Sequence, residues 1–266
     1  MDKPAIPFAP PASLRLGPAP GVAAEMHPAR RVLEGGGRAL MLWLHDGGFT
    51  CGSLASARPR AELLAEAGAD VVAIDYPLAP EHRFPAALAA AFEALQAMAA
   101  KAARLTGSTQ TALFVAGEEA GGNLAAALAL MARDQRAPAL AGQLLISPML
   151  DPQLGSPSMR EGECGHCECI YAKGWQAYLG GSTRADHPYA APLNASRLAG
   201  LPQALVLGVA GHPLNDEARR YAAALRANGG AARDLTLPAI APAHVLAPVH
   251  DFLSRATARA LSTNPA

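Results

Sequence analysis

Short apolar runs alternate along this chain with longer segments in which apolar residues recur at helical spacing. Alternation of this kind is typical of a parallel sheet that is covered by helices on both faces. The pattern predicts strands at residues 38–44, 70–75, 111–116, 141–146, 203–209 and 232–237. It predicts helices at residues 57–67, 85–105, 120–134, 215–227 and 248–260. We therefore expect an α/β fold built on a doubly wound, mostly parallel sheet.

The chain has the length of one α/β domain and contains no apparent repeat or second core, so residues 1–266 are expected to form a single domain. Residues 1–30 carry seven prolines, which is too many for a long helix. Ligands of parallel sheets bind beyond the carboxyl ends of the strands, where loops can cover them. A lid over such a site would therefore come mostly from a lid-like insertion at residues 151–192.

Acidic and basic residues balance at 22 each, which gives a formal net charge of zero. This balance gives no electrostatic reason to expect a nucleic acid or an anionic membrane as a partner. The N-terminus lacks the basic and then apolar pattern of a signal peptide, and the Ala-rich stretch 85–105 carries charges. We expect a cytoplasmic protein with a small-molecule ligand or substrate, no membrane partner and no cofactor, and the composition leaves a homodimer open.

The segment Gly117-Glu118-Glu119-Ala120-Gly121 lies between an expected strand and an expected helix. A strand, a turn with glycine at both ends and a helix form the pattern of a nucleophile elbow, in which a strained central side chain stands exposed above the sheet. The central residue of this pattern is a serine in hydrolases. Here it is Glu119, and no Ser, Cys or Asp occupies the centre of such a frame elsewhere in the chain.

Several ordered motifs along the chain resemble those of one enzyme family. The segment His45-Asp46-Gly47-Gly48-Phe49 follows an expected strand and is similar to an HGGGF oxyanion motif. Residues 71–76, 78–82 and 84–86 are similar to a DYRLAPEHPFPA signature, and residues 146–151, 156–161 and 213–217 match further motifs. Together they cover about residues 38–262 and resemble the hormone-sensitive-lipase-like carboxylesterases, the bacterial family IV group of the α/β-hydrolase superfamily. The resemblance implies the α/β-hydrolase fold with a reduced lid.

The resemblance also implies the parts of an esterase pocket. The backbone amides of Gly47, Gly48 and Ala120 would form the oxyanion hole, which stabilises the negative charge that develops on a carbonyl oxygen. The neighbouring residues expected to contact the substrate are His45, Asp46 and Glu118.

Two of the three positions of the catalytic relay depart from the family pattern. Glu119 stands where the family has its nucleophilic serine. His212 stands where the family has the acid of a D-P-L-R-D-E run, and His244 falls at the position of the catalytic histidine. The candidate catalytic residues are therefore Glu119, His244 and His212, and only His244 keeps the family's residue type.

Ordinary ester hydrolysis is not expected from these residues. A carboxylate that attacks an ester carbonyl would form an anhydride, which is a high-energy intermediate, whereas a serine forms an ester. His212 cannot supply the negative charge with which the acid of a relay orients the catalytic histidine. We therefore favour the hypothesis of a catalytically impaired or non-catalytic pseudo-hydrolase that binds a small molecule.

Two catalytic alternatives stay open. Glu119 could attack a saturated carbon, as aspartate does at the elbow of dehalogenases and epoxide hydrolases, or it could act as a general base with His244. The second alternative is a weak carboxylesterase. In the non-catalytic hypothesis, an ionised Glu119 accepts hydrogen bonds at the positive N-terminus of the following helix. Asp46 adds a further carboxylate nearby, but no established metal spacing is present, so no metal is expected.

The cysteines at positions 164, 167 and 169 form a second unusual cluster. Cys164 and Cys167 flank a histidine and offer soft ligands suited to zinc. Structural zinc sites usually draw on two separated pairs, and the only other cysteine is Cys51. We expect neither a zinc site nor a disulfide in this segment.

Overall fold

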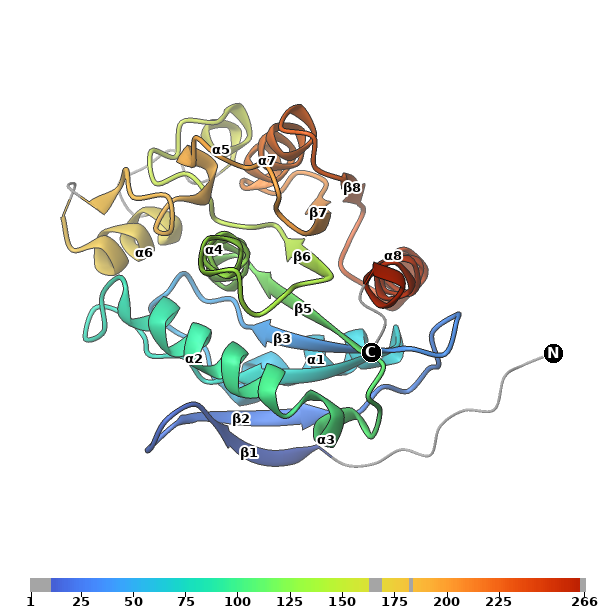
Figure 1. The fold of residues 1–266 in the computed structure, drawn as a ribbon. Coiled ribbons are helices and arrows are strands. Elements are labelled where there is room, and N and C mark those ends of the chain that lie inside the picture. Colours follow the sequence, from blue (N-terminus) through green and yellow to red (C-terminus); the bar gives the residue numbers. More distant parts are fainter. Residues whose placement is uncertain (1–10, 163–168, 182–183, 264–266) are drawn as a thin grey trace.

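A computed structural model describes residues 11–162, 169–181 and 184–263 of the chain. Within these residues the strands form one eight-stranded sheet in the order β1-β2-β4-β3-β5-β6-β7-β8 (Figure 1). The strands are β1 (Ala12–Leu16), β2 (Val22–His27), β3 (Arg38–Leu44), β4 (Ala69–Ile74), β5 (Thr111–Glu118), β6 (Gly142–Ile146), β7 (Gln203–Val209) and β8 (Ala232–Leu237). The pairs from β4 to β8 are parallel, and only the pairs that involve β2 are antiparallel. The predicted α/β architecture with a mostly parallel sheet is confirmed.

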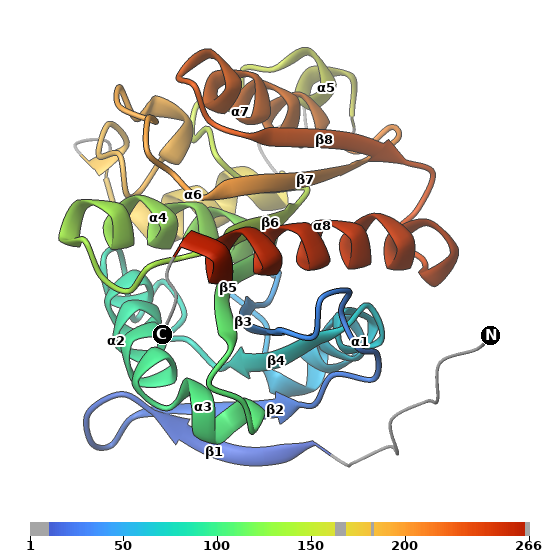
Figure 2. The same ribbon diagram turned by 45° about the vertical axis from the view of Figure 1, so that its right-hand side comes forward.

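Helices cover both faces of this sheet (Figures 1 and 2). They are α1 (Leu54–Glu66), α2 (Ala86–Ala100), α3 (Ala102–Thr106), α4 (Ala120–Gln135), α5 (Pro157–Glu161), α6 (Ile170–Leu179), the short 3-10 helix η2 (Pro192–Asn194), α7 (Asn215–Ala227) and α8 (Pro242–Thr263). Helices α1 and α8 pack on one face, whereas α2, α4, α6 and α7 pack on the other. No helix in the described ranges combines the length and the apolar character that a membrane crossing requires.

The central strands bury both of their faces. In β3, Leu40 and Leu42 face the core under α2 and α4, whereas Met41 and Trp43 face the core under α1 and α8, and all four side chains are buried. An uninterrupted apolar run is the pattern expected of a parallel strand with helices on both sides. This pattern explains why the bounds predicted for β3 and β7 agree with the structure to the residue. The bounds predicted for β8 also agree, although β8 is an edge strand with a single buried residue.

The Pro-rich N-terminal segment contains a β-hairpin that the sequence did not predict. Strands β1 and β2 pair in antiparallel register and continue the sheet beyond β4. Proline is excluded from ladder positions that donate a backbone hydrogen bond, and the prolines of this segment lie in the turn and the flanks, at Pro11, Pro18, Pro20 and Pro28. The number of prolines argued against a long helix, but their positions leave two short segments free of proline, and these segments form the strands.

Three of the predicted helices differ from the observed ones by more than two residues or by a break. Helix α1 begins at Leu54 rather than at residue 57, because Ser53 caps it and forms a capping box with Ser56. Helix α8 begins at Pro242, the first-turn position that proline favours, and Pro248 lies inside the helix. The long helix predicted at 85–105 is divided into α2 and α3 at Lys101.

Two of the helices, α5 and α6, lie within the insertion at 151–192 that we predicted to be lid-like. Helix α6 contacts the loop after β3 through Tyr178, whose ring stacks on Phe49 with the centroids 3.9 Å apart. The backbone N–H of Phe84 donates to the carbonyl of Tyr178 at 2.8 Å. The insertion thus packs against the loop that carries the oxyanion motif, and its role as a lid remains a prediction.

Candidate active site

Glu119 occupies the tip of a sharp turn between β5 and α4. Its backbone has φ 48° and ψ −112°, a strained conformation outside the regions that non-glycine residues favour. A Cβ atom added to Gly117 would lie 2.2 Å from Gly121, and one added to Gly121 would lie 2.1 Å from the carbonyl oxygen of Leu44. Only glycine fits at these two positions, so the local geometry is that of a nucleophile elbow with a glutamate in place of serine.

The loop after β3 carries the predicted oxyanion motif beside this elbow. Gly47 and Gly48 have φ of +104° and +57°, which favours glycine at both. The carbonyl of Gly47 accepts hydrogen bonds from the N–H groups of Thr50 and Cys51 at 3.1 and 3.0 Å, which closes the loop. Ala120, the third predicted donor, is buried at the first position of α4. Gly47 and Ala120 therefore lie beside Glu119, and the role of the three predicted donors in stabilising an oxyanion stays a prediction.

His45 helps to order the oxyanion loop. Its side chain is buried, its ring stacks on Tyr76 with the centroids 4.2 Å apart, and its Nδ1 lies 2.7 Å from the carbonyl oxygen of Asp46. Burial lowers the pKa of His45, which keeps the ring neutral. These contacts are those of a loop-ordering residue, and the prediction that His45 contacts a ligand has no support from them.

The carboxylate of Glu119 accepts hydrogen bonds from two directions. The hydroxyl of Tyr171, on α6, donates to its Oε1 at 3.0 Å, and the backbone of Gly47 provides a second hydrogen bond. Burial raises the pKa of Glu119, and the negative charges of Asp46 and Glu118 raise it further, whereas the two hydrogen bonds oppose this shift. A donor of the oxyanion loop is thus already engaged by the side chain at the elbow.

His212 lies next to this carboxylate. Its Nε2 is 3.8 Å from Oε1 of Glu119 and 3.4 Å from the hydroxyl of Tyr171. Its Nδ1 accepts a hydrogen bond from the backbone N–H of Leu214 at 3.2 Å, and burial lowers its pKa. A neutral imidazole whose Nδ1 is an acceptor carries its proton on Nε2. His212 therefore presents an N–H group, not a base, to Glu119.

His244 forms no hydrogen bond or ion pair with Glu119 or His212 in the described part of the chain. It lies in the first turn of α8, and its Nδ1 is buried without a hydrogen-bond partner within the described part of the chain. In a Ser-His-Asp relay this nitrogen donates to the acid. Among the described residues no hydrogen bond or ion pair joins His244 to Glu119. The structure brings together two of the three candidate catalytic residues, Glu119 and His212, and leaves the third without its acid.

Glu118 points to a different partner. Arg60, on α1, forms a two-point hydrogen-bonded ion pair with it, with N–O distances of 2.7 and 3.1 Å, and also donates to the carbonyl of Ile240. Burial raises the pKa of Glu118 and Asp46 adds to the shift, whereas the Arg60 guanidinium opposes it. The carboxylate that we predicted to face a substrate is therefore held by a cation from the neighbouring helix.

Removing this cation should destabilise the protein in a pH-dependent way. In Arg60→Met the buried carboxylate of Glu118 loses its partner, which should cost about 1–2 kcal/mol of unfolding free energy near neutral pH. The pKa of Glu118 is raised in the folded state, so the native state binds more protons than the unfolded state, and stability falls as pH rises through that pKa. Urea denaturation should show a smaller loss at about pH 5 than at about pH 7.5.

The double variant Arg60→Met with Glu118→Gln is the matched control for this experiment. It removes both charges, so it should recover most of the lost stability and show little pH dependence. An equal loss in the single variant at both pH values would contradict the assignment, because it would indicate lost packing of the arginine rather than an unpaired carboxylate.

Tyr171 and Arg60 are the two site residues that the sequence did not identify. Neither belongs to a motif of the family pattern. Tyr171 follows the cysteine cluster within the insertion, and Arg60 lies on an outer helix, so their contacts depend on how α6 and α1 pack against the elbow. An acidic pair at an elbow calls for donors or cations nearby, but it does not say which residues provide them.

The cysteine cluster falls mostly beyond the structural description. Cys164 and Cys167 lie outside the described residues, Cys169 is buried immediately before α6, and Cys51 is exposed on the oxyanion loop. Within the described ranges no group of three or more His, Cys, Asp or Glu side chains could hold a metal ion. The expectation about zinc at these cysteines remains a prediction.

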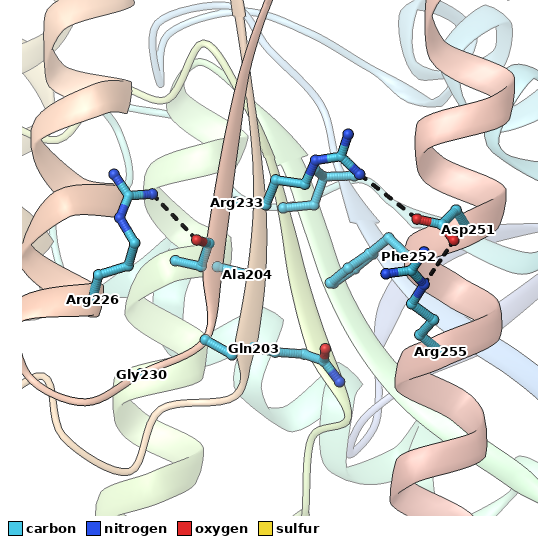
Figure 3. A pocket seen from close by; sticks show the side chains of 11 residues that line it. Gln203, Ala204, Arg226, Gly230, Arg233, Asp251, Phe252 and Arg255 are labelled. Carbon is cyan, nitrogen blue, oxygen red and sulfur yellow. Dashed lines mark hydrogen bonds and ion pairs between the residues drawn. The ribbon is translucent and has the colours of Figure 1, made fainter.

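A cavity of about 360 Å³ lies at the other end of the sheet, between β8 and α8 (Figure 3). Arg233 and Arg255 point to Asp251 there, with N–O distances of 3.6 and 2.8 Å, and Arg226 pairs with Asp234 at 2.6 Å. The three guanidinium groups are thus paired within the protein. The cavity also adjoins the amino ends of β7 and β8, whereas ligands of such sheets bind at the carboxyl ends, so we assign the function to the elbow.

Comparisons with known proteins agree with this geometry. The model of a family described as having the alpha/beta hydrolase fold matches residues 41–240. The chain is 38% identical over 200 residues to carboxylesterase NlhH of Mycobacterium tuberculosis, which covers 71% of this chain and 61% of that protein. It is 36% identical over 223 residues to carboxylic ester hydrolase LipN of the same species, which covers 80% of this chain and 59% of that protein. The chain thus spans about three fifths of the length of these relatives.

A solved structure extends the likeness to nearly all of the fold. The hyperthermophilic esterase from the archaeon Pyrobaculum calidifontis is 30% identical and superposes with a TM-score of 0.77, and the match covers 97% of this chain and 87% of that one. The similarity therefore includes the elbow, the oxyanion loop and the sheet that positions them.

Proposed function

Because this chain belongs to the α/β-hydrolase fold family, in its hormone-sensitive-lipase-like esterase group, we propose that it keeps the esterase pocket and binds a small molecule there without ordinary ester hydrolysis. The observation that carries the proposal is the position of the Glu119 carboxylate. It replaces the nucleophile at the elbow and accepts hydrogen bonds from Tyr171 and from Gly47 of the oxyanion loop. The nucleophile position of an esterase pocket is thus occupied by a side chain that cannot replace the serine.

The hydrogen bonds of Glu119 oppose catalysis in two ways. They stabilise its ionised, acceptor form, so the carboxylate is a weaker nucleophile than a free one. They also engage the Gly47 group that would otherwise stabilise a developing oxyanion, and the negative charge of Glu119 itself would repel that oxyanion. Losing one oxyanion donor alone costs about 10²–10³ in rate in a serine protease.

The relay also lacks a working base. His212 presents its Nε2–H to the elbow, and Nδ1 of His244 has no acceptor in the described part of the chain. Without a carboxylate on Nδ1, a catalytic histidine is neither held in the correct tautomer nor stabilised as an imidazolium. Both departures support binding without turnover over weak carboxylesterase activity.

One observation favours a catalytic alternative. The pKa of Glu119 is raised by burial and by its acidic neighbours, and a raised pKa suits a general base or a nucleophile that acts on a saturated carbon. In the nucleophilic route Glu119 would form an alkyl ester with the substrate. Water would then cleave this ester at the glutamate carbonyl and leave one of its oxygens in the side chain.

Isotope incorporation distinguishes the two functions. The protein is incubated with styrene oxide, and separately with p-nitrophenyl acetate, in water enriched in oxygen-18, and the peptide that contains Glu119 is then analysed by mass spectrometry. We expect no label at Glu119 beyond the background of its neighbour Glu118, which lies in the same peptide and serves as the internal control. Label that accumulates at Glu119 only, and only with substrate, would overturn the proposal in favour of the nucleophilic alternative.

A further inference from the structure

The side chain at the elbow carries a negative charge, in a place where an esterase binds the negative oxygen of its substrate. In an esterase pocket, backbone N–H groups face a ligand oxygen that becomes negative. Here the Glu119 carboxylate lies against that loop and presents negative charge and lone pairs to the pocket instead. We propose that this pocket selects small organic ammonium ligands, which would donate hydrogen bonds to Glu119. This inference rests on the proposed binding function and names the ligand class for the same site.

Glu119 has the capacity to accept a ligand. A carboxylate has about four lone-pair positions, and the described contacts of Glu119 comprise hydrogen bonds from Tyr171 and Gly47 and the nearby Nε2–H of His212. Its side chain is 19% exposed, so a small donor can reach it. Strong binding of an ionised group requires this combination of partial burial, which limits competition from water, and an accessible acceptor.

Among the described residues, no Lys or Arg side chain pairs with the carboxylate of Glu119. The charges that act on its pKa are those of Asp46 and Glu118, and both are negative. The guanidinium of Arg60 pairs with Glu118, and burial lowers the pKa of His212, which keeps that ring neutral. A bound ammonium would therefore supply the positive charge that the described side chains around Glu119 do not provide.

The geometry favours an organic cation over a metal ion. Calcium and magnesium need several oxygen ligands around one point, and no group of three or more acidic, His or Cys side chains is so placed within the described ranges. An ammonium group needs only hydrogen-bond acceptors within reach of its N–H groups. The carboxylate of Glu119 provides such acceptors, and the negative charges nearby attract the cation.

Calorimetry with matched probes tests the inference. Benzylammonium and benzyl alcohol share one ring and differ in the head group, and neither can be hydrolysed. At about pH 7.5 we expect benzylammonium to bind at least about tenfold more tightly than benzyl alcohol, as a charge-assisted hydrogen bond would give. In Glu119→Gln, which keeps the shape of the side chain, this preference should fall to within about twofold. Glu93→Gln removes an exposed carboxylate on α2 and should keep the full preference.

A pH series gives a second readout that does not depend on the variant folding well. Protonation removes the negative charge of Glu119, so benzylammonium binding should weaken as pH falls through its raised pKa, while benzyl alcohol binding stays constant. Within the described residues, the other titratable or charged groups that act on Glu119 are Asp46 after β3, Tyr76 after β4, Glu118 with its Arg60 partner, Tyr171 on α6 and His212 after β7. Protonation of Asp46 or His212 would weaken binding in the same direction.

The outcomes separate this inference from the function on which it rests. Equal affinities for the two probes, tighter binding of the alcohol, or no binding of benzylammonium would overturn the inference about ligand class. None of these results would affect the proposed lack of ester hydrolysis, which is measured by turnover. Conversely, rapid ester turnover together with an ammonium preference that Glu119→Gln removes would overturn the proposed function and leave the charge assignment in place.

Discussion

The purified protein should hydrolyse p-nitrophenyl acetate at least about a thousandfold more slowly than a member of its family with an intact Ser-His-Asp relay, a loss of about 4 kcal/mol in transition-state stabilisation. Two of the three relay residues are replaced, and a serine protease that loses any one of them keeps only about 10³–10⁴-fold catalysis over water. The structure adds a further cost, because Glu119 also engages the Gly47 group of the oxyanion loop.

Two alanine variants control for this measurement. If the residual rate does not depend on the altered relay, then Glu119→Ala and His244→Ala should each change it by no more than a few fold. Robust turnover that disappears in His244→Ala but survives in Glu119→Ala would contradict the assignment, because it would reveal a nucleophile other than the elbow residue. Initial rates with short-chain p-nitrophenyl esters are sufficient to distinguish these results.

The central strands of the sheet could be predicted from sequence because they are buried on both faces. A strand such as β3 or β7 must be apolar at nearly every position, and glycine, proline or charge ends the run on both sides. The hairpin of β1 and β2 lacks such a run, because its edge strand β1 reads Ala-Ser-Leu-Arg-Leu and four of these five residues are not buried. An edge strand is stabilised by pairing with a neighbouring strand, and the pattern of apolar residues within one segment does not reveal that pairing.

The elbow itself was also predictable, since its geometry is imposed by local sterics. Gly117 and Gly121 must be glycine because a Cβ atom at either position would collide with backbone, and this requirement appears directly as a sequence spacing. The partners of the central side chain are different. Tyr171 reaches Glu119 from α6, which packs against the oxyanion loop through contacts such as the stacking of Tyr178 on Phe49. Such a contact depends on packing between distant segments, and no local pattern encodes it.

The three acidic residues at the elbow, Asp46, Glu118 and Glu119, influence one another through their negative charges. The negative charge of Asp46 raises the pKa of both Glu118 and Glu119 beyond the effect of burial, and the charge of Glu118 also raises the pKa of Glu119. The two glutamates have different partners. The guanidinium of Arg60 neutralises the charge of Glu118, whereas Glu119 accepts a hydrogen bond from the uncharged hydroxyl of Tyr171. Because a hydroxyl leaves the charge of Glu119 uncompensated, this carboxylate is available to a ligand.

Restoring the two lost relay residues together should restore ester hydrolysis. In Glu119→Ser with His212→Asp, the elbow would present a hydroxyl in place of a carboxylate, and the Gly47 group would be free for an oxyanion. The new aspartate would provide the acceptor that the buried Nδ1 of His244 lacks. We expect p-nitrophenyl acetate turnover at least about a hundredfold above that of either single variant, or about 2.7 kcal/mol.

The gain should be strongly non-additive, because each single change leaves a different part of the machinery missing. Glu119→Ser alone provides a nucleophile whose histidine has no acid, and His212→Asp alone places another negative charge beside the carboxylate that still blocks the hole. Adding His244→Ala to the double variant is the decisive control, since activity that arises from a rebuilt relay must disappear with its base. A double variant that is folded by circular dichroism and thermal unfolding but remains as slow as the singles would show that the pocket has diverged beyond these two positions. That result would point to Asp46 and Tyr171, the remaining residues that set the charge and hydrogen bonding of the elbow.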